Sequence, residues 1–289
     1  MVPLFVVSAI IVLGCSGWGY WHSIRSNPER TLYGAIENNF RVKSLTRQVV
    51  QQNGPQKREL DVELSLSPEA VAHGHDNISQ TGEVDASVKT ESMSTPSEEF
   101  VRYTSIETTQ KNAKGEGLDF KDLLGKWGRS SSEKTGQPGE LYGESILGVV
   151  PTGNLGARDR QALMKTIRDN NVYKFDEATL SRSNENGRPT YVYDVTVTPT
   201  AYIQVLKQFG TMVGLKQLEG LDPSQYANAE PLTFKLTVDV WSQKFTGIEY
   251  AGGQRTERIG SYGLNHDVTL PKESIPVEEL QAKLQAAQE

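Results

Sequence analysis

The chain has 289 residues, of which 36% are hydrophobic and 23% are charged, and its net charge is −6. Phosphate backbones attract basic proteins and repel acidic ones, so we expect no nucleic-acid partner. The one cysteine, Cys15, excludes an internal disulfide. The low hydrophobic content favours a broad sheet with one solvated face over a parallel α/β enzyme.

The segment 1–24 contains no Lys, Arg, Asp or Glu and is largely apolar up to Trp21. About 20 apolar residues span the hydrocarbon core of a bilayer, and aromatic residues such as Trp18 and Tyr20 favour its interface. We therefore expect a transmembrane signal-anchor at 1–24, followed by an exported domain at 25–289. This arrangement tethers the domain to the extracytoplasmic side of a bacterial cell membrane.

Two alternatives to the anchor stay open. The run Val12-Leu13-Gly14-Cys15 resembles a bacterial lipobox, which makes Cys15 a candidate for lipidation, although Leu13 stands where a small residue is usual. The other alternative is a cleaved signal peptide. That class has a basic N-terminal region, which Met1-Val2 does not supply.

The exported domain begins with a helix and continues as strands. Asn27 is a typical helix cap, Pro28 fits the first helical position, and Leu32 and Ile36 lie on one apolar stripe, so we expect a helix from Pro28 to about Val42. Alternating apolar residues then predict several strands. These lie at 45–52, 60–66, 84–88 and 100–109, with a turn-rich segment at 67–81.

The section from Gln110 to Pro138 is mostly polar, and it holds a possible boundary between two sub-domains near 110–140. Within it lies one apolar cluster, for which we expect a short helix packed onto the sheet. Its members are Leu118, Phe120, Leu123, Leu124 and Trp127.

The second half of the domain repeats the pattern of helices and alternating strands. We expect helices at 158–168, from Pro199 to Val213 and at 276–287, and strands at 191–197, 234–240, 245–250, 255–262 and 268–270. The order of helices and runs of strands predicts an α+β fold with a mostly antiparallel sheet.

Motifs of the common enzyme classes do not occur, so we expect a protein that is not an enzyme and that holds no cofactor. The run His73-Gly74-His75-Asp76 is the one cluster of metal-ligating residue types. Because it falls in the turn-rich segment, we expect a solvated loop there and no metal. The glycine turn at 153–156 has no Lys-Ser/Thr partner and is interpreted as the entry to a helix.

Three features together resemble the LolA/LppX-like class of bacterial envelope proteins and lipoproteins. They are the helix from Pro28 followed by Ser44-Leu45-Thr46, the alternating strands around a helical insert, and the ending from Tyr262 to Pro271. The resemblance implies a curved, half-barrel-like antiparallel sheet with helices packed on its concave face. It also implies a non-enzymatic carrier of lipid, acyl chains or another apolar molecule.

In such a carrier the ligand lies between sheet and helices, which points to one helix face and a lid. The helix face is Tyr202, Val205, Leu206, Phe209 and Met212, and the lid is Leu123, Leu124 and Trp127. The same residues suit a solid core equally well, because an amphipathic helix buries such a face with or without a ligand. The alternative function is a surface-interaction or envelope-structural protein without a ligand cavity.

Overall fold

The computed structural model describes residues 27–112, 114–131, 139–185 and 187–287. The expected anchor at 1–24 and its Cys15 lie outside these residues. Across the described residues, none of the helices combines the length and the apolar character that a membrane span requires.

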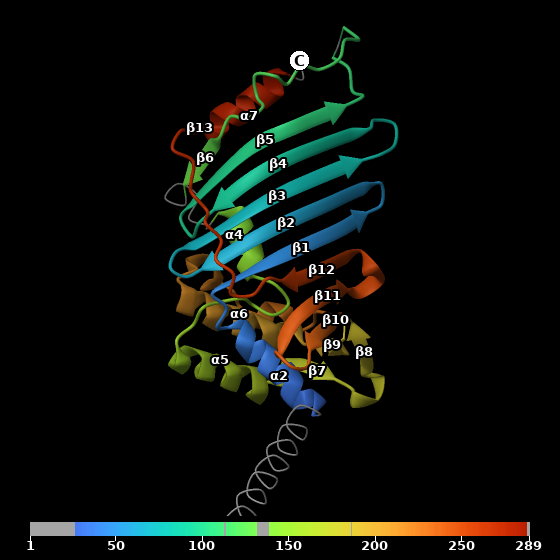
Figure 1. Cartoon of the computed structure of the whole chain (residues 1–289), viewed down its shortest axis with the longest axis vertical. Coiled ribbons are helices and arrows are strands. Elements are labelled where there is room, and N and C mark those ends of the chain that lie inside the picture. The colour runs from blue at the N-terminus through green and yellow to red at the C-terminus, as the bar shows by residue number, and fades with distance from the viewer. Residues whose placement is uncertain (1–26, 113, 132–138, 186, 288–289) are drawn as a thin grey trace, which may run out of the picture.

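The domain is built on one sheet of thirteen strands that curves and stays open (Figure 1). The strands are β1 (Ser44–Asn53), β2 (Gln56–Leu66), β3 (Ala70–Gln80), β4 (Ala86–Ser94), β5 (Glu98–Thr108), β6 (Gly128–Ser131), β7 (Tyr173–Phe175), β8 (Ser181–Glu185), β9 (Arg188–Val197), β10 (Leu232–Asp239), β11 (Lys244–Tyr250), β12 (Arg255–Gly260) and β13 (Ile275–Pro276).

The strand order is β13-β6-β5-β4-β3-β2-β1-β12-β11-β10-β9-β7, with β8 also paired to β9. Every pair is antiparallel except β13 with β6. Strands β1 to β5 follow one another as hairpins, and β1 joins them to the late strands through β12. The expected α+β class and the curved, mostly antiparallel sheet are confirmed.

Five α-helices accompany the sheet in the described part of the chain. They are α2 (Pro28–Asn39), α4 (Glu140–Ile146), α5 (Ala157–Asp169), α6 (Pro199–Val213) and α7 (Val277–Ala286). Helix α2 begins as expected, because the Asn27 side chain accepts a hydrogen bond from the Arg30 amide at 2.9 Å. Helix α4 lies behind the central strands in Figure 1 and contacts β2, β3 and β4.

We call the sheet face that packs on α4 the inner face, and the opposite face the outer face. The inner side chains of β1 and β2 and the apolar faces of α2, α5 and α6 form one continuous core. A second, smaller cluster lies at the far end of the sheet, where Phe120 and Leu123 pack on Leu280 of α7. Figure 1 shows α7 beside β6 and β13, away from α5 and α6.

Three sequence-based expectations about elements were wrong. The segment 67–81 is not mainly turns: it contains β3, which pairs with both β2 and β4 over most of its length. The apolar cluster at 118–127 forms no helix: residues 121–125 are turns, which end at Gly125 with φ of 77°, and the rest is irregular. The final short strand is β13, and 268–270 is irregular.

Candidate functional site

The four-residue run His73-Gly74-His75-Asp76 lies within β3, and strand alternation divides it between the two faces of the sheet. In the register of β2 with β3, Gly74 lies opposite Val62 and Asp76 opposite Leu60, both on the inner face. The two histidines therefore point to the outer face. One short motif contributes to two separate groups of side chains.

On the inner face, a cleft of about 380 Å³ opens between α4, α7 and strands β2 to β6. Gly74 lets α4 approach, because a Cβ added there would lie 2.9 Å from Cδ2 of Leu141. The cleft is lined by polar and apolar groups in similar proportion. Its lining residues are Arg58, Leu60, Gly74, Asp76, Thr90, Ser92, Glu99, Val101, Ser130, Glu140, Leu141, Glu144, Val277 and Gln281.

Among the described residues of this lining, Arg58 is the one cation, and its guanidinium is paired with two carboxylates. Its Nε donates to Asp76 Oδ2 at 2.7 Å, and its two terminal nitrogens donate to the two carboxylate oxygens of Glu144 at 3.1 and 3.0 Å. Planar guanidinium and carboxylate groups match in this two-pronged geometry. Arg58 thereby joins β2, β3 and α4.

A chain of alternating charges extends this contact along the inner face. Arg255 lies 3.4 Å from Glu144 and donates to Glu257 at 3.0 Å, and Tyr250 donates to the same Glu257 oxygen at 2.9 Å. Arg47 Nε lies 3.5 Å from the other oxygen of Glu257. This row of side chains contains three arginines and three carboxylates, so its charges balance. They are Arg47, Arg58 and Arg255, and Asp76, Glu144 and Glu257.

Two further carboxylates, Glu99 and Glu140, give the described lining of the cleft a surplus of negative charge. The Glu99 carboxylate accepts hydrogen bonds from the backbone amides of Glu140 at 2.8 Å and Leu141 at 3.4 Å, and so caps α4. Burial raises the pKa of Glu99 above its usual value and outweighs these amides. Burial also raises the pKa of Asp76, although Arg58 opposes it. Asp76 Oδ1 is buried and has no hydrogen-bond partner among the described residues.

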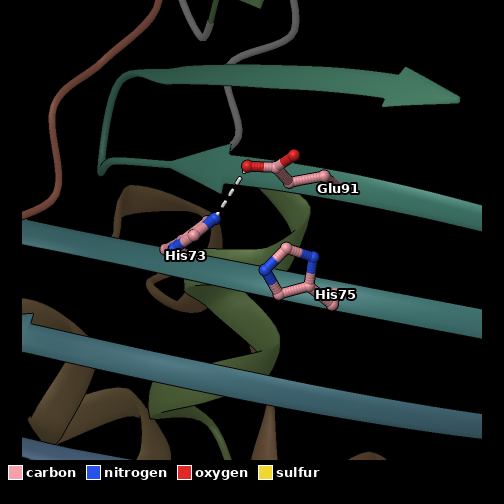
Figure 2. Close-up of side chains that lie close together, drawn as sticks. All are labelled: His73, His75 and Glu91. Carbon is pink, nitrogen blue, oxygen red and sulfur yellow. Dashed lines mark hydrogen bonds and ion pairs between the residues drawn. The ribbon is translucent and has the colours of Figure 1, made fainter. Parts of the chain in front are cut away.

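On the outer face, His73 and His75 lie beside Glu91 of β4 (Figure 2). Glu91 is opposite His75 in the strand register, and His73 Nε2 lies 3.0 Å from Glu91 Oε1. The second oxygen of Glu91 accepts hydrogen bonds from Arg102, at 2.8 Å from its Nε. Burial raises the pKa of Glu91, but Arg102 and His73 outweigh burial and hold the pKa below its ordinary value.

The predicted ligand-binding residues of α6 lie in the main core. Val205 and Phe209 are fully buried, and Tyr202 and Met212 are partly buried against the same cluster. The Tyr202 hydroxyl donates to the carbonyl oxygen of Gly148. Leu206 is partly buried. These positions show close packing, and ligand binding by them stays a prediction.

The structure does not bring the predicted lid to α6. Leu123 belongs to the small cluster at the far end of the sheet, and its chain neighbour Leu124 is half-buried. The Trp127 ring lies under the guanidinium of Arg102, 4.6 Å from its centroid. A role for these three residues at a ligand also stays a prediction, but they do not share a site with α6.

The charged residues of the cleft were not identified as a site from the sequence, although a signal was present. Arg58 precedes Leu60, Val62 and Leu64 at the same two-residue spacing, so it lies on the face that these leucine and valine side chains bury. A charge in the buried register of a strand requires a partner, because burying an unpaired charge is costly. Glu144 is that partner, and it lies on a helix that the sequence pattern did not reveal.

No family model matches the chain, and no curated protein sequence matches it. Among solved structures, the crystal structure of LprF from Mycobacterium bovis is similar, at 15% sequence identity and a TM-score of 0.42. The match covers 86% of this chain and 98% of that chain.

Proposed function

We propose that the chain is a non-enzymatic binding protein whose ligand enters the cleft between α4, α7 and the inner face of the sheet. The observation that carries the proposal is the makeup of this cleft. Among the described residues that line it, four carboxylates face one cation, which is already paired; the carboxylates are Asp76, Glu99, Glu140 and Glu144. Such a lining favours a ligand that presents hydrogen-bond donors, such as amine or hydroxyl groups.

The cleft also suits an apolar part of the same molecule. Leu60, Val101, Leu141 and Val277 contribute apolar surface to its lining. Its volume, about 380 Å³, lies at the lower end of the range for small-molecule sites, roughly 300 to 1,000 Å³. An amphiphile with an amine- or hydroxyl-bearing headgroup and a short apolar portion in the cleft satisfies both parts of the lining. Lipid headgroups belong to this chemical class.

Membrane tethering is part of the proposal and rests on the sequence. The uncharged, apolar segment 1–24 has the length and the aromatic end of a membrane anchor. An extracytoplasmic binding protein held in this way meets amphiphiles at the membrane surface.

The test is to purify the full chain in detergent and to compare native with denaturing mass spectrometry. A Ser92→Leu variant extends an apolar side chain from β4 into the cleft, whereas Thr256→Leu makes the same kind of change at an exposed position of β12. We expect a bound amphiphile that co-purifies with the wild type and with Thr256→Leu, and at least tenfold less of it with Ser92→Leu.

Two results would contradict the proposal. Retention of the same molecule by Ser92→Leu would place it elsewhere on the protein. A wild-type chain that carries no small molecule, and that takes up neither an amine-bearing nor a hydroxyl-bearing amphiphile, would favour the alternative of a surface-interaction protein.

A further inference from the structure

We propose that His73, His75 and Glu91 form a binding site for a divalent transition-metal ion of the zinc class on the outer face of the sheet. The three side chains come from adjacent positions of two paired strands (Figure 2). Each offers one ligand atom, and these atoms all lie within 4.8 Å of one another.

The distances suit a metal ion after small side-chain rotations. Zinc binds imidazole nitrogen and carboxylate oxygen at about 2.0 Å, which sets neighbouring ligand atoms of a tetrahedral site about 3.3 Å apart. His73 Nε2 and Glu91 Oε1 are already 3.0 Å apart. The ring of His75 lies edge-on to that of His73, with centroids 4.9 Å apart. Because His75 is exposed, its ring is free to turn toward the other two ligands.

Arg102 holds Glu91 in place, and a second carboxylate lies near His73. Arg102 engages Oε2 of Glu91 and leaves Oε1 for the ion. On the other side, Glu63 Oε2 lies 3.9 Å from Nδ1 of His73. A carboxylate hydrogen-bonded to the second ring nitrogen is the usual support of a metal-binding histidine, and a small rotation of the half-exposed Glu63 side chain would bring its carboxylate within hydrogen-bond distance of His73.

A third histidine, His266, lies beside the same group of side chains. The sequence contains four histidines, and the three within the described residues all lie here. His266 is on the segment between β12 and β13, which crosses the outer face in Figure 1. Its Nδ1 lies 3.6 Å from Oε2 of Glu63, and its buried Nε2 has no hydrogen-bond partner among the described residues.

The ion would have access from solvent. A hollow of about 400 Å³ beside the cluster is lined by both strand histidines together with Asp61, Glu63 and Arg258. Two nitrogen ligands and one oxygen ligand with an open side leave room for water or another small ligand on the ion. This donor set suits Zn²⁺, Cu²⁺, Ni²⁺ or Co²⁺ better than Mg²⁺ or Ca²⁺.

The test is titration of the metal-free full chain with Zn²⁺ by calorimetry, using His75→Ala as the main variant because its side chain is exposed and its loss leaves the core intact. We expect one Zn²⁺ per chain in the wild type and at least tenfold weaker binding in His75→Ala. In His266→Ala, binding should weaken less than in His75→Ala, because His266 lies beside Glu63 and is not itself a ligand. Glu249→Gln removes a carboxylate from β11, far from the cluster, and should bind like the wild type.

Absence of Zn²⁺ binding by the wild type would overturn the proposal. So would equal binding by the wild type and His75→Ala, which would assign the ion to other groups, such as Cys15 and His22. The cleft variant Ser92→Leu should bind Zn²⁺ like the wild type, because Ser92 lies on the inner face. Failure of the metal site and failure of the proposed ligand cleft are therefore distinguishable.

Discussion

Arg58 on β2 and Glu144 on α4 meet in a two-pronged ion pair, with N–O distances of 3.1 and 3.0 Å. Helix α4 has seven residues, and a helix of that length is not stable on its own in water. Its place on the sheet therefore depends on contacts such as this pair. The same contact sets the shape of the cleft, since Glu144 and Leu141 form one of its walls.

Replacing Glu144 with Gln should lower the free energy of unfolding by about 2 kcal/mol, because it leaves Arg58 and Arg255 without their shared carboxylate in a partly buried place. Urea denaturation measures the change. Glu249→Gln breaks the exposed pair with Lys235 and should cost less than about 0.5 kcal/mol. Equal effects of the two variants would show that the ion pair does not hold α4.

Gly74→Ala should destabilise the protein by about 1 to 2 kcal/mol, because the new methyl group would lie 2.9 and 3.1 Å from the two Cδ atoms of Leu141. In a Leu141→Ala background this penalty should disappear, which a double-mutant cycle measures. Gly117→Ala is the control, since a Cβ there meets no atom within 4 Å. Additive effects of Gly74→Ala and Leu141→Ala would rule out the close contact.

The raised pKa of Glu99 predicts a pH dependence of stability. An acid with a raised pKa in the folded state holds its proton more tightly there than in the unfolded chain. Its contribution to stability therefore falls as pH rises from the unfolded value, about 4.3, through the folded pKa. Gln at this position does not titrate. The free energy of unfolding of the wild type minus that of Glu99→Gln should thus decrease between pH 4 and pH 7, as measured with urea. A difference that grows with pH would mean that the amides of α4 lower the pKa instead.

Phe209→Ala should cost about 3 to 4 kcal/mol, because this ring is fully buried against Phe40 and the backbone of Gly153. Leu206→Ala, one turn away on the same helix and only partly buried, should cost much less. If α6 serves as core, neither variant changes the amount of amphiphile that co-purifies with folded protein. Loss of ligand without loss of stability in Phe209→Ala would instead support the predicted binding role of α6.

Helices and strands whose apolar residues recur at a regular spacing could be predicted from the sequence. Strand β3 shows why other elements could not. Helix α2 and strand β2 carry their apolar residues at the spacing that a helix and a half-buried strand require. In β3, Gly74 and Asp76 occupy inner positions because α4 and Arg58 lie against them. The alternation of apolar and polar residues is lost there, and the segment resembles a turn.

The cleft could not be predicted from the sequence for a related reason. Its charges lie on elements far apart in the chain, and only the fold brings Arg58, Glu144 and Arg255 together. The histidine cluster was partly visible as His73 and His75. Its partners Glu91 and His266 are 16 and 191 residues beyond His75 in the sequence (91 − 75 and 266 − 75), so their proximity depends on strand register and on the path of the late segment.

The junction of β1 with β12 has a consequence for the order in which the molecule is assembled. Strands β1 to β5 are complete once residue 108 has been made, yet the free side of β1 receives its partner only at residues 255–260. Throughout that interval the strand offers an open row of backbone groups to any other extended chain. Arg47, whose charge points to the inner face, discourages such pairing until Glu257 arrives to neutralise it. The Arg47–Glu257 pair is therefore completed only when the late strand β12 joins the early part of the sheet.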